Sequence, residues 1–285
     1  MSGAVAWPGA VGLLVRQVRH QLLMFWRVPV AVFFTVALPI VILVVFNAVF
    51  GGGVITDPAG EWPISQFYVG ALAAFTAVSA TYTNLANMVP IRREEGVLKR
   101  WRATPLPVSI LVAGHVLAAV VIALLGTSLV MLLGIVAYDV TVDVAALPAA
   151  LITFLVAVSS FAALGMAIAA LVPTASSASA VANATILPLA FVSNVFIPLD
   201  SAPGWIDLIG DVFPLKPFVE AFQSSFHPSA PSTTPDWPAL AVIAVWGVVG
   251  AVVALGRFRW DAAPDGSTRR RRAARAAVGA DLGDD

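Results

Sequence analysis

The chain has 285 residues, of which 59% are hydrophobic and only 11% are charged, and its formal net charge is zero. Soluble domains contain about 45–50% apolar and about 25% charged residues, so this composition indicates a protein that lies mostly in lipid. The sequence contains no cysteine, which excludes disulfides, thiol nucleophiles and cysteine-based zinc sites.

Residues 1–27 are expected to form a cytoplasmic N-terminus that contains an amphipathic helix. Apolar residues recur there at helical spacing, whereas Arg16 and Arg19 fall mainly on other faces. A helix of this kind lies in the membrane interface, with its apolar face against the lipid. The alternative is an ordinary basic flank that only sets the topology. The apolar positions are Val11, Leu14, Val15, Val18, Leu22 and Phe25.

Six segments are apolar enough to cross a membrane, and none of them contains Asp, Glu, Lys or Arg. A membrane helix needs about 20 mostly apolar residues, because the hydrocarbon core is about 30 Å thick. The fifth segment is the weakest candidate, because it contains Asn183, Pro188 and Asn194. The sequence therefore predicts an all-α polytopic membrane domain over residues 28–256. The six predicted spans are residues 28–50, 67–89, 108–137, 147–172, 180–197 and 237–256.

The distribution of basic residues predicts the orientation of these spans. Cytoplasmic loops of membrane proteins carry an excess of Lys and Arg. With six spans, the two termini and the loops after the second and fourth spans share one side. That side carries every Lys and Arg except Lys216. Both termini are therefore expected in the cytoplasm, including a basic tail, residues 257–285, that we expect to be disordered and to bind anionic lipid rather than nucleic acid.

A charged segment, "IRREEGVLKRWRATPLP" at residues 91–107, separates the second and third predicted spans. Residues 94, 97, 98 and 101 follow the helical spacing i, i+3, i+4, i+7. This spacing predicts a short helix over 91–103 with an apolar ridge that begins at a carboxylate. Two prolines then stop the helix. A loop that only sets topology needs neither the acidic pair nor the ridge, although it remains the alternative; a docking helix for a cytoplasmic partner explains both. The ridge consists of Glu94, Val97, Leu98 and Trp101.

The connection between the fifth and sixth spans, residues 196–228, is too apolar for a free loop. Asp200 or Ser201 can cap a first short helix that ends before Pro214. A second short helix is expected over 217–226. Two half-length helices on the outer side predict a re-entrant or interfacial hairpin, because lipid does not tolerate exposed irregular backbone. A surface amphipathic loop is the alternative.

Motifs for catalysis are absent from the sequence. It contains no G-x-x-x-x-G-K-[ST], H-E-x-x-H or G-x-S-x-G pattern, so no nucleotide cradle or hydrolase centre of these kinds is expected. His115 is expected to be a packed or interfacial polar residue, because no activated serine accompanies it. Asn84, Asn87, Asn183 and Asn194 place amides inside apolar spans. They are candidates for a translocation path, or for hydrogen bonds between helices.

This ordered set of features resembles the ABC-2 type permeases, the membrane subunits of ATP-binding-cassette exporters. Within that family it is most similar to the daunorubicin-resistance permease group. The resemblance covers residues 10–258 and rests on two stretches: R-E-E-G-x-L-K-R-x-R-x-T-P-L within the charged segment, and "FIPLDSAPGWIDLIGDVFPLKPFVEAF" at 196–222.

The resemblance implies that the helix before the first span and the charged segment contact a separate ATPase subunit, which binds ATP and Mg²⁺, so that this chain binds no cofactor or metal. It implies a non-enzymatic permease in the bacterial plasma membrane that pairs with a second copy or a homologous permease. The substrate would be an amphipathic small molecule: a drug, an antibiotic or a lipid-like metabolite. A polysaccharide or glycolipid exporter and a non-transporting membrane scaffold are the alternatives. The implied ATPase contacts are Glu94, Glu95, Leu98, Trp101, Arg16 and Arg19.

Overall fold

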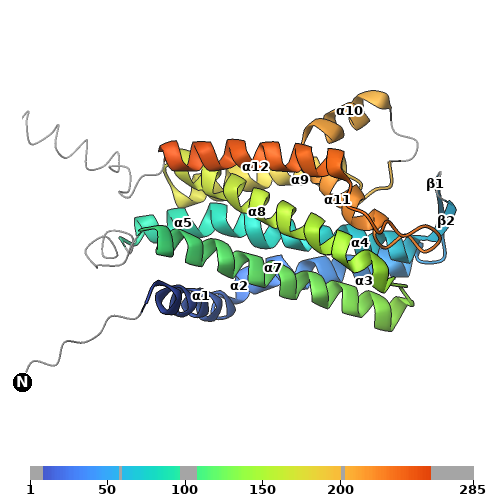
Figure 1. The fold of residues 1–285 in the computed structure, drawn as a ribbon, viewed down its shortest axis with the longest axis horizontal. Helices are drawn as coiled ribbons and strands as arrows, with labels where there is room; N and C mark the ends of the chain where they lie inside the picture. The colour runs from blue at the N-terminus through green and yellow to red at the C-terminus, as the bar shows by residue number, and fades with distance from the viewer. Residues whose placement is uncertain (1–8, 58–59, 97–107, 200–202, 258–285) are drawn as a thin grey trace, which may run out of the picture.

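The computed structural model describes residues 9–57, 60–96, 108–199 and 203–257, which form a bundle of helices along one long axis with a small hairpin at one end (Figure 1). Five helices of the described residues are long and apolar enough to cross a membrane. They are Pro29–Phe50, Ile64–Glu94, Val112–Tyr138, Val144–Leu171 and Trp237–Arg257. A mostly helical chain with several helices suited to crossing a membrane is therefore confirmed. Five of the six predicted spans have such a helix, and the all-α prediction missed the small hairpin at residues 54–63.

The elements of the first half are α1 (Ala10–Trp26), α2 (Pro29–Val32), the π-helical turn η1 (Phe33–Ala37), α3 (Leu38–Phe50), β1 (Val54–Asp57), β2 (Gly60–Pro63), α4 (Ile64–Val78), the π-helical turn η2 (Ser79–Thr83) and α5 (Asn84–Glu94). Those of the second half are α7 (Val108–Tyr138), the 3-10 turn η3 (Val144–Ala146), α8 (Leu147–Leu171), α9 (Ala175–Phe191), α10 (Gly204–Val212), α11 (Leu215–Ser224) and α12 (Trp237–Arg257). β1 and β2 pair antiparallel, with Ile55 opposite Trp62.

The fifth predicted span differs from the structure in both position and length. The corresponding helix, α9, covers Ala175–Phe191 and has 17 residues, whereas the prediction was 180–197. It begins earlier because the Thr174 hydroxyl caps it by accepting a hydrogen bond from the Ser177 amide at 3.2 Å. It ends before Asn194, which has a left-handed φ of 56°. At about 1.5 Å per residue, α9 extends about 26 Å, slightly less than the hydrocarbon core.

The predicted helix over 91–103 is wrong as a continuous element. Residues 91–94 form the last turn of α5, so that α4, η2 and α5 make one unbroken helix, Ile64–Glu94. Gly96 then takes a φ of 69°, and its amide donates to the Arg93 carbonyl at 3.2 Å. Glycine accepts this left-handed conformation without strain, which is why helices commonly end at it. Residues 97–107, including Leu98 and Trp101, lie outside the described residues.

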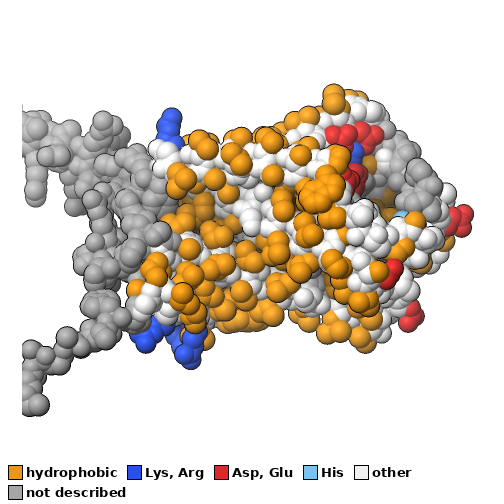
Figure 2. All heavy atoms as spheres, viewed as in Figure 1, with side chains coloured by type: hydrophobic (Ala, Val, Ile, Leu, Met, Phe, Trp, Pro, Cys, Tyr) orange, Lys and Arg blue, Asp and Glu red, His pale blue; other side chains and the backbone are white. Residues whose placement is uncertain are grey.

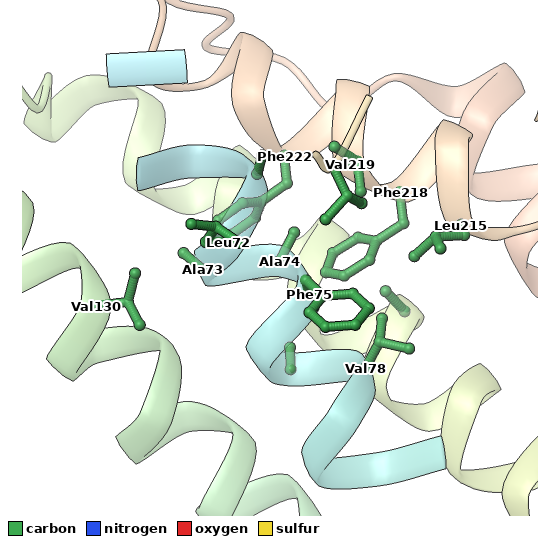
Figure 3. Packing of buried hydrophobic residues seen from close by; sticks show 14 of the residues in the cluster. Leu72, Ala73, Ala74, Phe75, Val78, Val130, Leu215, Phe218, Val219 and Phe222 are labelled. Carbon is green, nitrogen blue, oxygen red and sulfur yellow. The ribbon is translucent and has the colours of Figure 1, made fainter. Parts of the chain in front are cut away.

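The core is built around α4, whose side chains are buried from Ser65 to Val78. Helix α11 lies directly against α4: Figure 3 shows Phe218 of α11 beside Ala74 and Phe75 of α4, and a Cβ on Gly70 of α4 would lie 2.9 Å from the Gln223 Cγ of α11. Phe218 is fully buried, so α11 lies inside the bundle and is not a surface loop. The sequence also predicts α10, which lies on the outside of the bundle (Figure 1) with Trp205 and Leu208 exposed.

The charges separate to the two ends of the bundle (Figure 2). One end, here called the arginine end, carries blue side chains beside the grey residues, whereas red side chains mark the opposite, acidic end. Among the described residues, α1 and the ends of α5 and α12 carry the basic side chains at the arginine end, which lie beside Glu94 and Glu95: Arg16, Arg19, Arg27, Arg92, Arg93 and Arg257 (Figure 1). The elements at the acidic end, which are β2, the turn after α7, α10, α11 and the start of α12, carry or adjoin Glu61, Asp139, Asp143, Asp207, Asp211, Glu220 and Asp236.

Candidate functional site at the arginine end

Helix α1 lies across the arginine end, foreshortened in Figure 1 where the long helices run lengthwise. Its bundle side carries Gln21 and Phe25, each 1% exposed, and Gln17. Gln17 lies so close to α7 that a Cβ on Gly114 would sit 2.3 Å from its Cγ. Val11, which the sequence places on the apolar face, is 76% exposed. The predicted helix is confirmed, but the face that packs on the bundle is partly polar.

A cavity of about 10 Å³ lies between α1, α5 and α7. Gln21, Asn84 and His115 contribute its polar atoms, and neither amide atom of Gln21 has a hydrogen-bond partner among the described residues. Such a volume holds about one water molecule. The remaining lining is apolar: Leu85, Met88, Ala118, Ala119 and Ile122. Asn84, a predicted path residue, therefore faces a polar junction near the arginine end.

Arg92 joins α5 to α7 through His115. Its Nη1 donates to His115 Nε2 at 2.7 Å, and both side chains are buried. A guanidinium has only donors, so the facing ring nitrogen accepts and the imidazole carries its proton on Nδ1. His115 is thus a packed polar residue, as the sequence predicts, whereas Arg92 is a buried structural group rather than a loop charge.

Arg93 binds the carboxyl end of α8. The guanidinium is 3% exposed and donates to the carbonyls of Ala169 at 3.3 Å, Pro173 at 3.0 Å and Val172. The last carbonyls of a helix have no partner within the helix and carry a partial negative charge. A cation in this position stabilises the helix end by about 0.3–1 kcal/mol when exposed and up to about 2 kcal/mol when partly buried.

Glu94 binds the amino end of α9. Its Oε1 accepts a hydrogen bond from the amide of Ala175, the first residue of α9, at 2.7 Å. A carboxylate at a helix N-terminus satisfies a free amide and meets a partial positive charge. Two consecutive side chains of α5 therefore hold the two sides of the turn between α8 and α9. We call Arg93, Glu94 and the backbone groups that they bind the α5 clamp.

The residues implied as ATPase contacts lie at the same end of the molecule where the structure describes them. Arg16 and Arg19 are exposed on α1, and Glu95 is exposed at the end of α5. Glu94 is also exposed, although its carboxylate holds α9. Their role toward an ATPase stays a prediction.

The four asparagines predicted for a path lie in four different surroundings. Asn84 lines the small cavity, and Asn87 has a buried Oδ1 without a hydrogen-bond partner among the described residues. Asn183 is exposed on α9. Asn194 lies beyond α9, donates to Glu220 Oε1 at 2.6 Å and accepts from the Leu199 amide at 2.9 Å. The last residue therefore joins α9 to α11 near the acidic end.

Lys216 binds the carboxylates at the acidic end, a role that was not among the predictions from the sequence. Its side chain, 8% exposed, lies 2.8 Å from Asp211, 3.2 Å from Asp207 and 3.8 Å from Glu220. Burial lowers the Lys216 pKa, but the three carboxylates outweigh it and leave the pKa raised. Burial raises the pKa of Glu220, against the opposing charge of Lys216. The two carboxylates four residues apart on α10 were the available signal, since Lys216 alone is basic there.

Two further side chains fix the connection at the acidic end through hydrogen bonds. Trp246 of α12 donates from Nε1 to the Val212 carbonyl at 2.8 Å, at the end of α10. Gln66, at the start of α4, donates to the Thr141 carbonyl at 3.0 Å and to the Phe226 carbonyl. The α10–α11 pair is therefore joined to α4, to α12 and to the turn after α7.

Comparisons with known proteins agree with this architecture. The model of the ABC-2 type transporter family matches residues 14–227, from α1 to the turn after α11. The daunorubicin resistance ABC transporter permease protein DrrB1 of Streptomyces coeruleorubidus is 30% identical over 230 residues, covering 78% of this chain and 77% of that protein. The residues that the family model matches include most of α1, the long helices up to α8, and the short helices α9, α10 and α11. The chain belongs to the ABC-2 type transporter family.

Proposed function

We propose that this chain is the membrane subunit of an ATP-binding-cassette exporter, driven by a separate ATPase and located in a bacterial plasma membrane. The observation that carries the proposal is the family match across residues 14–227. The relative named for daunorubicin resistance supports export of an amphipathic small molecule, such as a drug, an antibiotic or a lipid-like metabolite. The largely apolar spans also favour a substrate that partitions into the membrane.

The arginine end faces the cytoplasm in this proposal, with α9 as a sixth, short crossing. The positive-inside rule supports the orientation, because the described arginines gather at one end of the bundle. A crossing somewhat shorter than the bilayer is accommodated by local thinning at modest cost. The α10–α11 connection then lies at the outer surface, where the exposed Trp205 and Leu208 of α10 contact lipid and α11 re-enters the bundle.

The ATPase docks at the arginine end in this account. Exposed Arg16, Arg19 and Glu95 supply charged contacts, and Leu98 and Trp101 supply the apolar ridge predicted from the sequence. The ATPase binds ATP and Mg²⁺, because this chain has no phosphate-binding motif. Closure of two ATPase subunits then moves the charged segments of two permease copies.

A second permease copy completes the assembly. Asn183 is exposed in the middle of α9, a helix without Asp, Glu, Lys or Arg. An amide that faces lipid has no hydrogen-bond partner there, which is unfavourable. We therefore expect this face of α9 to meet the second copy or the substrate path between the copies.

The test is co-purification with the ATP-binding-cassette ATPase encoded next to this chain, through a tag on this chain alone. The double variant Leu98→Asp with Trp101→Asp should lose about tenfold or more of the retained ATPase, because apolar anchors carry most binding energy at such interfaces. Glu61→Lys, an equally drastic charge change at the acidic end, is the matched control and should retain it.

Three readouts decide this test: retained ATPase, ATP turnover and efflux of daunorubicin from cells. The proposal expects the wild-type chain to support all three and the double variant to support none while it still inserts normally. A double variant that behaves as wild type would disprove docking through the charged segment. A wild-type chain that retains no ATPase would disprove the permease assignment and favour a scaffold.

A further inference from the structure

The α5 clamp joins three helices at one point through complementary charges. Arg93 brings a cation to the carboxyl end of α8, and Glu94 brings a carboxylate to the amino end of α9. Each side chain matches the partial charge of the helix end that it meets. The order of the two residues therefore fits the direction of the chain through the turn, and the opposite order would place like charges together.

The clamp lies where the charged segment enters the bundle. Gly96 ends the helical conformation two residues after Glu94, and a Cβ there would meet nothing within 4 Å. Residues 97–107 therefore connect to the bundle through the last turn of α5 at one end and through α7, which begins at Val108, at the other, and the clamp lies at the first of these connections. In the other direction, α5 continues without a break through η2 into α4, which contacts α11 near the acidic end.

Helix α9 has few other attachments to the bundle. Its buried face consists of three alanines and one isoleucine, spaced four residues apart: Ala178, Ala182, Ile186 and Ala190. Small side chains leave shallow ridges, so this face resists sliding less than one with large side chains. In addition to this buried face, α9 is attached through the Thr185 hydroxyl, which shares a hydrogen bond of 2.5 Å with the Tyr82 hydroxyl of η2. The clamp and this bond tie α9 to the same continuous helix, Ile64–Glu94.

We infer that the α5 clamp transmits movement of the charged segment to the turn between α8 and α9, so that α9 moves with the docked ATPase. Arg93 and Glu94 are positioning residues in this account, since they act through the helix ends that they bind. The inference rests on the proposed function, because a docked ATPase supplies the movement.

A probe at the start of α9 tests the inference directly. Ser176→Cys introduces one thiol into a chain without cysteines, at an exposed position in the first turn of α9. A bimane dye on this thiol reports changes in its surroundings. The labelled chain is assembled with its ATPase in lipid nanodiscs, and fluorescence is compared before and after trapping the ATPase with ATP and vanadate.

Three variants in the Ser176→Cys background separate transmission from docking. Arg93→Leu should retain the ATPase as the parent does but reduce the fluorescence change about fivefold or more, as loss of a typical coupling interaction would. Arg93→Lys keeps a cation at the helix end and should recover at least about half of the change. Arg257→Leu removes an exposed arginine at the same end and should behave as the parent.

Each outcome decides the inference. Arg93→Leu with normal ATPase retention and an undiminished fluorescence change would overturn it, and so would Arg93→Lys that recovers nothing. If Arg93→Leu fails to insert, Ala175→Pro replaces it, because it removes the amide that Glu94 binds, leaves the Glu94 side chain in place and puts proline at the first helical position, where it is tolerated. A parent chain that retains no ATPase would refute the proposed function itself, and the transmission role with it.

Discussion

Arg92 and Arg93 are neighbours in the sequence but bind different helices. Arg92 donates to His115 on α7, and Arg93 donates to carbonyls at the end of α8. Both guanidiniums are buried, at 7% and 3% exposure. Positive charges that sequence analysis assigns to membrane orientation therefore also hold the arginine end together. The orientation predicted from the sequence and the packing seen in the structure therefore involve the same two side chains.

Removal of the Arg93 guanidinium should destabilise the chain. Arg93→Ala leaves buried carbonyls of Ala169 and Val172 without this donor, and such a loss costs about 1–3 kcal/mol. Thermal unfolding in detergent measures the effect. Arg257→Ala should stay within about 0.5 kcal/mol of wild type, because Arg257 is exposed. Equal stability of the two variants would contradict the importance of the carbonyl contacts.

Lys216 predicts a stability effect that depends on pH. Its raised pKa means that the stabilisation is fully present below its unfolded value near 10.5 and is lost as pH rises through the folded value. Glu220 also has a raised pKa, so its contribution is present below 4.5 and falls as pH rises through its folded value. At neutral pH the charge of Lys216 therefore offsets part of the cost of burying an ionised Glu220.

Lys216→Met should accordingly destabilise more at pH 8 than at pH 4, because pH 4 lies below the raised Glu220 pKa and that carboxyl group is then mostly uncharged. The partner carboxylates are 44–62% exposed, so solvent screening limits the expected loss at pH 8 to about 1 kcal/mol. Denaturation curves at both pH values measure it, with Glu61→Gln as the control for an exposed acid at the same end. A Lys216→Met variant that loses more stability at pH 4 than at pH 8 would contradict the predicted pH dependence.

Among the elements, the long spans could be predicted from the sequence because uninterrupted apolar runs need no tertiary information. Helix α9 and the charged segment could not. The Thr174 cap makes α9 begin earlier than predicted, and the left-handed Asn194 lies beyond its end. Gly96 interrupts the helix that the apolar spacing of residues 94–101 predicts. The α5 clamp could not be predicted from the sequence either, because Arg93 and Ala169, whose carbonyl it binds, are 76 residues apart in the chain. Hydropathy finds the elements, whereas contacts between distant residues decide where they end.

Gly96 should control the direction in which the charged segment leaves α5. A side chain at φ 69° costs about 1–2 kcal/mol, although a Cβ there would clash with nothing. Gly96→Ala should therefore favour extension of α5 and lower ATP turnover of the assembled transporter, with normal insertion. ATPase activity of the purified assembly checks this expectation. Unchanged turnover would show that the exit direction has no part in coupling.

Helices α8 and α12 pack closely enough to depend on one glycine. A Cβ on Gly250 would lie 2.8 Å from the backbone nitrogen of Leu164. Gly250→Val should push the helices apart and destabilise the chain by about 1–3 kcal/mol, the usual effect of overpacking. Gly256→Val is the matched control, since nothing lies within 4 Å of its Cβ position. Thermal unfolding of both variants decides whether this contact is as tight as the distance indicates.

The whole molecule has two ends with different tasks. The arginine end carries the helix α1, the α5 clamp and the start of the charged segment. The acidic end carries Lys216 and the buried helix α11. The helix Ile64–Glu94 joins them as one rod, so a displacement at one end can reach the other without crossing a loop. In the proposed function, the ATPase would dock at one end of this helix and the substrate would leave at the other.

Site-specific photo-crosslinking in cells tests the central claim, that an ATPase docks at the arginine end. A benzophenone amino acid replaces Glu95 in one strain and Glu61 in another, since both side chains are exposed at opposite ends of the bundle. The account predicts that Glu95 crosslinks to the ATPase encoded next to this chain and that Glu61 does not. Crosslinking from Glu61 alone would reverse the orientation, and crosslinking from neither would contradict the docking of an ATPase on this chain.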